Sequence, residues 1–201
     1  MQCQAFNCAE VLGDRRPELI WHTNLRGQTP LSMAVLGGRI SLARFFWKQL
    51  QATCSDQTAL RQHLIRRFPD DTTLMHRLAT QADWQGRLSM KFMIEACCGL
   101  GSSSKLALQD LIMSVDASGN TALHVAADNG KVGNLTLMVA CAHLVSPQGD
   151  LERQLLQQLN CDDYNLMLCA GNAEDYMLDE AECKEHLEVI SFLLKHVRCM
   201  I

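Results

Sequence analysis

Apolar and polar positions recur along this chain in a fixed order. A polar turn leads into a Thr and a short apolar stretch, and a Gly–basic pair then precedes a longer stretch with apolar residues every three or four positions. The order is clearest in three stretches, Asn24–Val35 (NLRGQTPLSMAV), Phe68–Ala79 (FPDDTTLMHRLA) and Asp116–Ala127 (DASGNTALHVAA). Apolar residues at three- and four-residue steps are typical of amphipathic helices. An internal repeat of this kind predicts an all-α solenoid of stacked units.

The start of each short helix is marked by a residue that can cap it. In the third repeat, Asp116 favours a turn, Gly119 can adopt a positive φ, and Thr121 stands where a helix N-cap belongs. In the first repeat, Pro30 follows the cap directly, at a helical position that needs no amide donor. The four expected caps are 44, 48 and 44 residues apart: Thr29, Thr73, Thr121 and Asn165.

A second, longer helix is expected after each short one. Gly38–Trp47 (GRISLARFFW) aligns with Gly86–Glu95 (GRLSMKFMIE), while Gly130–Val139 (GKVGNLTLMV) and Glu185–Leu194 (EHLEVISFLL) are looser copies. A Gly before a basic residue suits a turn between antiparallel helices. We therefore expect each of the three leading glycines to lie in such a turn.

The spacing of the units leaves room for a third helix in each. Before each polar turn lies a stretch of helical character, and in three of these stretches an apolar pair stands five and four residues ahead of the turn. A regularly placed apolar pair indicates packing rather than a flexible loop. The four expected third helices are Ala9–His22, Asp56–Arg67, Lys105–Val115 and Asp150–Leu159.

Two further insertions depart from the repeat. Thr80–Gln85 (TQADWQ) lengthens the connection within the second unit, and Asn172–Lys184 (NAEDYMLDEAECK) places an acidic segment on an exposed turn of the fourth. Insertions in repeat arrays gather on one face and often contact partners. We expect a single domain over residues 1–201, with units of approximately 9–50, 51–100, 101–147 and 148–201.

These motifs resemble the ankyrin repeat, whose pattern reads roughly D-x-x-G-x-T-P-L-H-x-A and then G-H-x-x-V-V-x-x-L-L. DASGNTALHVAADNG (116–130) matches it almost completely, and NLRGQTPLSMAVLGG (24–38) and HLEVISFLLKH (186–196) match it well. The units are longer than the family's usual period of about 33 residues. The resemblance therefore implies an ankyrin-type solenoid of about four extended repeats, each with an additional helix. It also implies that His76 and His124 hydrogen-bond the backbone of the neighbouring turn.

Composition and charge exclude several classes of protein. The 201 residues are 48% hydrophobic and 20% charged, which is ordinary for a folded globular protein and argues against disorder. A formal net charge of −4 lacks the basic footprint of a nucleic-acid binder. No apolar run approaches the ~20 residues that cross a bilayer, and the N-terminus lacks the basic and apolar parts of a secretory signal. We expect a cytoplasmic protein without nucleic-acid binding or membrane insertion.

The ten cysteines do not form a metal-binding pattern. No C-x-x-C pair occurs, so the zinc signature is missing, and without a secretory signal we expect free thiols in a reducing compartment. A nucleophilic thiolate needs a base within reach and an electropositive pocket. Cys141 stands two residues from His143, but Cys97 and Cys141 lie at expected helix C-termini, where the helix dipole disfavours a thiolate. We therefore expect no catalytic residue, no metal and no cofactor.

The ankyrin resemblance implies a partner-facing surface on the turn tips and on the exposed side of the first helices. Three apolar residues, Leu25, Met33 and Leu36, lie there where solvent is expected. They would either anchor a partner or cover the additional helices, and both alternatives stay open. The remaining candidates are Arg26, Gln28, Asp70, Thr72, Arg77, Thr80, Ala117, Ser118, Asn120, Asp128, Asn129, Asp162 and Tyr164.

A non-catalytic protein–protein interaction module is the function that the resemblance implies, acting as a monomer on another protein. Irregular units with an extra helix look like the ankyrin proteins that intracellular bacteria deliver into host cells as effectors. A role in the host cytosol is therefore one form of this hypothesis. The alternative is a targeting domain of a larger enzyme whose catalytic part is absent from this chain. The chain ends soon after a second helix without an obvious polar cap, and this alternative expects a continuation.

Overall fold

The computed structural model describes residues 16–81, 83–171 and 180–198, and over these residues the chain is helical with no β-strand. Each of four units contributes a short first helix, a long second helix and an additional helix ahead of the first. The first helices are Pro30–Leu36 (α2), Leu74–Ala79 (α5), Ala122–Asp128 (α8) and Leu166–Gly171 (α11). The second helices are Ile40–Thr53 (α3), Asp83–Cys98 (α6), Val132–Val145 (α9) and Glu180–Arg198 (α12). The additional helices are Pro17–Trp21 (η1, a 3-10 helix), Gln57–Leu64 (α4), Ser104–Met113 (α7, preceded by the 3-10 turn Gly101–Ser103, η2) and Asp150–Gln157 (α10).

The expected additional helices are confirmed in three units and differ in the first. There only five residues form η1, and its N-cap position, Arg16, makes no side-chain capping bond. Residues 9–15 of the expected helix lie outside the described residues. The acidic insertion Asn172–Lys184 also lies largely outside them, and its described part, residues 180–184, forms the beginning of α12.

The turn expected at Gly86 is wrong. Helix α6 begins three residues earlier, so the second half of the insertion Thr80–Gln85 is helical. Gly38 and Gly130 do lie in turns, with φ of +64° and +67°. At Gly86 the need for glycine is spatial instead, since a Cβ there would lie 3.1 Å from the carbonyl oxygen of Leu78. Gly38 and Gly86 therefore occupy the same motif position for different reasons, a positive φ at Gly38 and the lack of space for a Cβ at Gly86.

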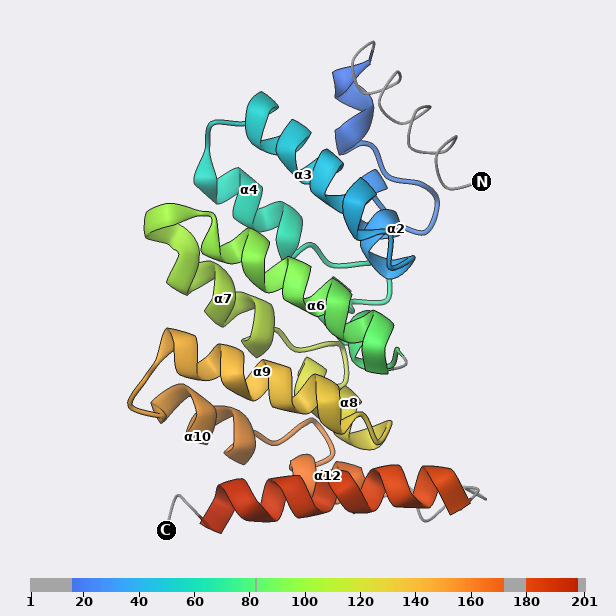
Figure 1. The fold of residues 1–201 in the computed structure, drawn as a ribbon, viewed down its shortest axis with the longest axis vertical. Coiled ribbons are helices and arrows are strands. Elements are labelled where there is room, and N and C mark those ends of the chain that lie inside the picture. Colours follow the sequence, from blue (N-terminus) through green and yellow to red (C-terminus); the bar gives the residue numbers. More distant parts are fainter. Residues whose placement is uncertain (1–15, 82, 172–179, 199–201) are drawn as a thin grey trace.

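Figure 1 shows the units stacked along the long axis of the molecule, with the second and additional helices alternating on one face. Helix α7 packs against both α6 and α9, and α10 packs against α9. The first helices form a row of their own, in which α5 contacts α2 and α8, and α8 contacts α11. One continuous apolar core runs through all four units. The additional helices thus pack into the core of the array and are not loops on its surface.

All four expected N-cap residues directly precede a first helix. The Thr29 amide donates to Ser32 Oγ (2.9 Å), and the Ser32 amide donates back to Thr29 Oγ1 (3.1 Å). Histidine completes the same reciprocal capping box in α5 and α8. In α11 the equivalent position is Leu168, which cannot reach back, so Asn165 Oδ1 alone accepts the Leu168 amide (3.0 Å). Each cap satisfies amides that the first turn of a helix leaves without a partner.

In the first three units, carbonyl groups in the last turn of the first helix are bonded by a side chain of the following unit. Ser89 Oγ of α6 donates to the Val35 carbonyl oxygen of α2 (2.7 Å). Asn134 Nδ2 of α9 donates to the carbonyl oxygens of Leu78 and Ala79 in α5 (3.3 and 3.2 Å), and His186 of α12 contacts that of Asp128 in α8 (2.9 Å). A buried carbonyl without such a partner would cost about 1–3 kcal/mol. These side chains therefore fix the stacking of one unit on the next.

Candidate protein-interaction surface

Four turns with the same backbone project from the array, one ahead of each first helix. In every turn the amide of the first residue donates to the carbonyl oxygen of the fifth, at 2.8–3.0 Å. The fourth residue has a positive φ in every turn and is Gly27, Asp71, Gly119 or Asp163. We call residues 24–28, 68–72, 116–120 and 160–164, with the exposed side of the first helices, the turn-tip surface. Its shape is set by backbone geometry that all four units share.

Side chains at the start of the turns hold the tips in place. The Asn24 side-chain oxygen accepts from the amides of residues 26 and 28, at 2.9 and 3.0 Å. Asp116 and Asn160 make the same pair of bonds in the third and fourth turns, at 2.9–3.0 Å. The second turn begins with Phe68, which cannot accept, and Asp70 instead binds the amide and hydroxyl of Thr72. Rigid tips lose little conformational freedom when they contact a partner.

Neighbouring turns are joined by further hydrogen bonds. The amide of Cys161 donates to the Ser118 carbonyl oxygen (2.9 Å), and the Asn160 side-chain amide donates to Asn120 Oδ1 (2.8 Å). The expected histidine contacts are also present. His76 Nε2 lies 2.8 Å from the Asn120 carbonyl oxygen, and His124 Nε2 lies 3.1 Å from that of Gln158. The second, third and fourth turns thus form one connected frame.

The exposure of the three apolar candidates bears on one of the two alternatives, that they cover the additional helices. Leu25 is fully exposed and Met33 is 54% exposed, so neither covers an additional helix. Leu36 is partly buried against the core instead. Exposed apolar side chains at the rim of rigid turns are the kind of feature that a partner can cover.

Several of the polar candidates are engaged within their own units. Arg77 pairs with Asp70 (2.9 Å), and its guanidinium carbon lies 3.8 Å from the centre of the Phe68 ring. Asn129 caps the end of α8 by donating to the Val125 carbonyl oxygen (2.8 Å). The side chains of these residues are therefore held by contacts within the chain. The candidates that remain exposed on the turn-tip surface are Arg26, Asp70, Thr80, Ala117, Ser118, Asp128, Asp162 and Tyr164, while Gln28, Thr72 and Asn120 are half-buried.

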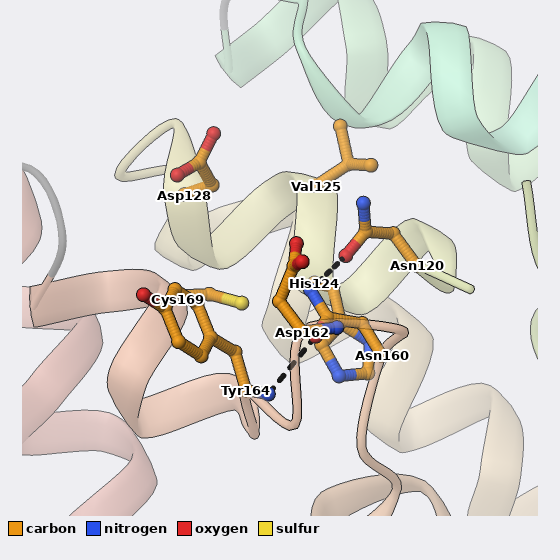
Figure 2. Close-up of a pocket in the computed structure, with 8 residues that line it drawn as sticks. All are labelled: Asn120, His124, Val125, Asp128, Asn160, Asp162, Tyr164 and Cys169. Carbon is orange, nitrogen blue, oxygen red and sulfur yellow. Dashed lines mark hydrogen bonds between the residues drawn. The ribbon is translucent and has the colours of Figure 1, made fainter. Parts of the chain in front are cut away.

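A hollow of about 150 Å³ opens between the third and fourth turns. Figure 2 shows the side chains that line it, which include carboxylates, amides, an aromatic ring and a thiol and come from the third turn, α8, the fourth turn and α11. It brings together four of the candidates and four further residues: Asn120, Asp128, Asp162 and Tyr164, with His124, Val125, Asn160 and Cys169. Sequence reasoning missed Asn160 as a lining residue, although it occupies the same turn position as Asn24 and Asp116.

Burial sets the charge states around this hollow. It lowers the pKa of His124, which keeps the imidazole neutral, and it raises the pKa of the Asp128 carboxyl, an effect that His186 partly offsets. Burial, followed by the nearby charges of Asp128 and Asp162, raises the pKa of the Cys169 thiol to about 11. The imidazole of His124 is therefore neutral and the thiol of Cys169 is protonated at neutral pH.

The described residues do not assemble the constellation of a metal site or a thiol nucleophile. No group of three or more His, Cys, Asp or Glu side chains there is placed to hold a metal ion. Cys141 is buried, and burial raises its pKa to about 12, while His143 pairs with Glu152 (2.6 Å). None of the helices in this part of the chain is long and apolar enough to cross a bilayer. What the surface offers is rigid shape, exposed apolar side chains and negative charge.

No family model matches this chain, and no curated protein is significantly similar to it. Among solved structures, the chain is similar to EF0377, whose crystal structure is described as that of an ankyrin repeat protein. The match has a TM-score of 0.60 at 16% sequence identity and covers 96% of this chain and 79% of the other. A likeness at this identity shows the fold alone. The expected ankyrin-type solenoid of extended repeats is thus confirmed.

Proposed function

We propose that this protein is a non-catalytic module that binds another protein through its turn-tip surface. The observation that carries the proposal is the row of four turns with the same backbone, of which the first and its helix present the exposed side chains of Leu25 and Met33, and the third and fourth enclose the hollow. A few anchor side chains that become buried near the centre of an interface supply most of its binding energy. A surface that is already ordered has little entropy left to lose on binding.

We propose that the protein acts as a monomer, since a second copy seated on the turn tips would occupy the site. An effector role in a host cytosol is a narrower version of the same proposal and is supported by the extended units alone. A targeting domain of a larger enzyme would use the same surface in the same way. The binding surface is therefore the part of the proposal to test first.

Two matched variants separate the turn-tip surface from the rest of the molecule. The double variant Leu25→Ser/Met33→Ser removes the apolar end of the surface. The control Leu106→Ser/Leu144→Ser makes the same chemical change on α7 and at the end of α9, where these residues are 53% and 61% exposed. All four positions are exposed, so we expect both variants to fold, and circular dichroism and thermal melting check this.

The assay is affinity capture from cell extract with the wild-type protein and both variants, quantified by mass spectrometry. We expect a specific partner whose capture falls at least about tenfold in the turn-tip variant, a loss of roughly 1.4 kcal/mol, and stays at the wild-type level in the control. Capture that depends on Leu106 and Leu144 but not on Leu25 and Met33 would contradict the proposal. The partner isolated in this way then serves for the quantitative measurements.

A further inference from the structure

Charge is distributed unevenly along the turn-tip surface. The segments 116–130 and 160–171, which form the third and fourth turns with their first helices, contain four Asp and no Lys or Arg. The first unit differs, because residues 24–37 contain Arg26 and no acidic residue. The surface therefore has an acidic half and a less charged, more apolar half. A partner bound along the whole surface would contact apolar side chains at one end and carboxylates at the other.

The acidic half is hollowed, and its carboxylates are not neutralised from within. Asp128 and Asp162 line the hollow, whereas no Lys or Arg does so. Lys131, the nearest lysine in sequence, forms an ion pair with Glu185, with 2.6 Å between Lys131 Nζ and Glu185 Oε2. His186 contacts the backbone carbonyl of Asp128, and its positive influence does not cancel the desolvation that raises the pKa of that carboxyl. Among the described residues, neither carboxylate makes a side-chain hydrogen bond or ion pair within the chain.

The lining of the hollow also has an apolar component. Val125, the ring of Tyr164 and the protonated thiol of Cys169 lie beside the two carboxylates. The volume, about 150 Å³, is far more than the roughly 10–15 Å³ that one water molecule needs, yet it is too small for a folded element. A hollow of this size with apolar walls and two carboxylates matches one long side chain that combines an apolar stem with a cationic end.

Arginine fits this lining better than lysine. Its planar guanidinium can donate to two carboxylates at once and can stack on an aromatic ring such as that of Tyr164, whereas an ammonium group is a more strongly hydrated point charge. The side-chain oxygens of Asn120 and Asn160 already accept hydrogen bonds within the frame of turns. The carboxylates are thus the anionic acceptors that the hollow offers to a ligand.

We propose that the hollow between the third and fourth turns receives an arginine side chain of the partner protein, with Asp128 and Asp162 as its counter-charges. This inference rests on the proposed function and specifies the chemistry of the partner. It places a basic residue of the partner over units three and four, and it leaves the apolar contacts with Leu25 and Met33 at the other end of the surface. Specificity for the partner then comes from ion pairing with the two carboxylates and from stacking on the Tyr164 ring.

Nuclear magnetic resonance titration of the ¹⁵N-labelled full chain tests the inference with a defined probe. The probe is an acetylated, amidated heptapeptide, Gly-Ser-Ala-Arg-Ala-Ser-Gly, and its control replaces the arginine by citrulline, a neutral near-isostere. We expect the arginine peptide to shift amide resonances of residues 116–130 and 160–171, and the citrulline peptide to leave them unchanged. Asp162→Asn weakens binding of the arginine peptide about fivefold or more, as expected for the loss of one partly desolvated charge pair.

Asp163→Asn is the matched control variant, because it removes the same charge from the adjacent residue, which does not line the hollow. We expect it to change the affinity less than about twofold. Equal weakening by the two variants, equal binding of the citrulline peptide, or shifts confined to other residues would each overturn the inference. Calcium chloride alone producing the same shifts and blocking the peptide would overturn it in favour of a divalent-cation site.

The inference and the proposed function fail in distinguishable ways. A captured partner that depends on Leu25 and Met33 but is indifferent to Asp162→Asn would overturn the arginine assignment and leave the binding module standing. A partner that is indifferent to all of these variants would contradict the proposed function itself.

Discussion

His76 Nε2 lies 2.8 Å from the backbone carbonyl oxygen of Asn120, which is 44 residues further along the chain. The other ring nitrogen of His76 accepts the amide of Thr73 (3.2 Å), so one side chain closes the cap of its own helix and binds the next turn. His124 repeats this arrangement with Thr121 and the carbonyl oxygen of Gln158. A bond to a carbonyl requires a protonated Nε2, and acceptance at Nδ1 then fixes the neutral tautomer. The histidines therefore couple local folding to the register of the turns.

Replacement of His76 by Ala is expected to destabilise the fold. The side chain is buried, and its loss leaves the Thr73 amide and the Asn120 carbonyl without their partner. The two losses together predict a decrease of about 2–4 kcal/mol in the free energy of unfolding, measured by urea titration. His22→Ala is the control, since His22 is exposed at the end of η1. Equal unfolding midpoints for the two variants would contradict the coupling role.

Stability is expected to decrease as the pH falls below about 6.5. Burial lowers the pKa of His76 and of His124 in the folded protein, whereas an unfolded histidine titrates near 6.5. Between the two pKa values the unfolded chain binds more protons than the folded chain. The contribution of these histidines to the free energy of unfolding is therefore complete above about pH 6.5 and decreases as the pH falls. His63, whose pKa is also lowered by burial, adds to the same slope.

Urea midpoints at pH 7.5 and 5.5 measure this effect. The double variant His76→Gln/His124→Gln keeps a neutral hydrogen-bonding side chain at the third helical position but removes both titrations. We expect its midpoint to change less between the two pH values than that of the wild type. An identical pH dependence in both proteins would show that these two histidines do not carry it.

The N-caps could be predicted from the sequence because they are local. A Thr ahead of an apolar run, with a Ser or His three residues later, involves only four positions, and Thr29, Thr73 and Thr121 are all N-cap residues as expected. The additional helices could also be predicted, because a regularly placed apolar pair signals packing. The order of elements and the class of fold follow from such short-range patterns.

The contacts between units could not be predicted in the same way. Ser89 and Asn134 cap the preceding first helix from different offsets within their own helices, so no fixed motif position marks them. Gly86 shows the converse problem, because it matches Gly38 in sequence and lies inside a helix in the structure. The hollow joins Asn120 to Asn160, 40 residues apart, and its existence depends on the stacking of two turns.

Gly119→Ala is expected to cost more stability than Gly149→Ala. Both glycines have a positive φ, of +75° and +81°, so each substitution pays about 1–2 kcal/mol for the left-handed conformation. A Cβ at residue 119 would also lie 2.9 Å from the amide nitrogen and the sulfur of Cys161, whereas nothing lies within 4 Å of a Cβ at residue 149. Thermal or urea unfolding of the two variants measures the difference. Equal losses would mean that the third and fourth turns are not in close contact.

Alkylation of the native protein is expected to distinguish two groups of cysteines. Cys98 and Cys161 are exposed, whereas Cys97 and Cys141 are buried, and burial raises the pKa of both buried thiols. Reagent attack needs an accessible thiolate, so iodoacetamide at pH 8 should label Cys98 and Cys161 first and Cys97 and Cys141 only on unfolding. Peptide mass spectrometry maps the sites over time. Rapid labelling of Cys141 in the native state would contradict its burial and would support a thiol nucleophile beside His143.

Hydrogen–deuterium exchange of the protein with and without its captured partner measures where on the array the partner binds. We expect the partner to slow exchange in residues 24–36, 68–80, 116–129 and 160–171, which contain the turns and the first helices. We expect no change in the second helices α3, α6 and α9, which lie on another face of the array (Figure 1). Protection confined to these second helices, with the turns unchanged, would contradict the claim that the protein binds through its turn tips.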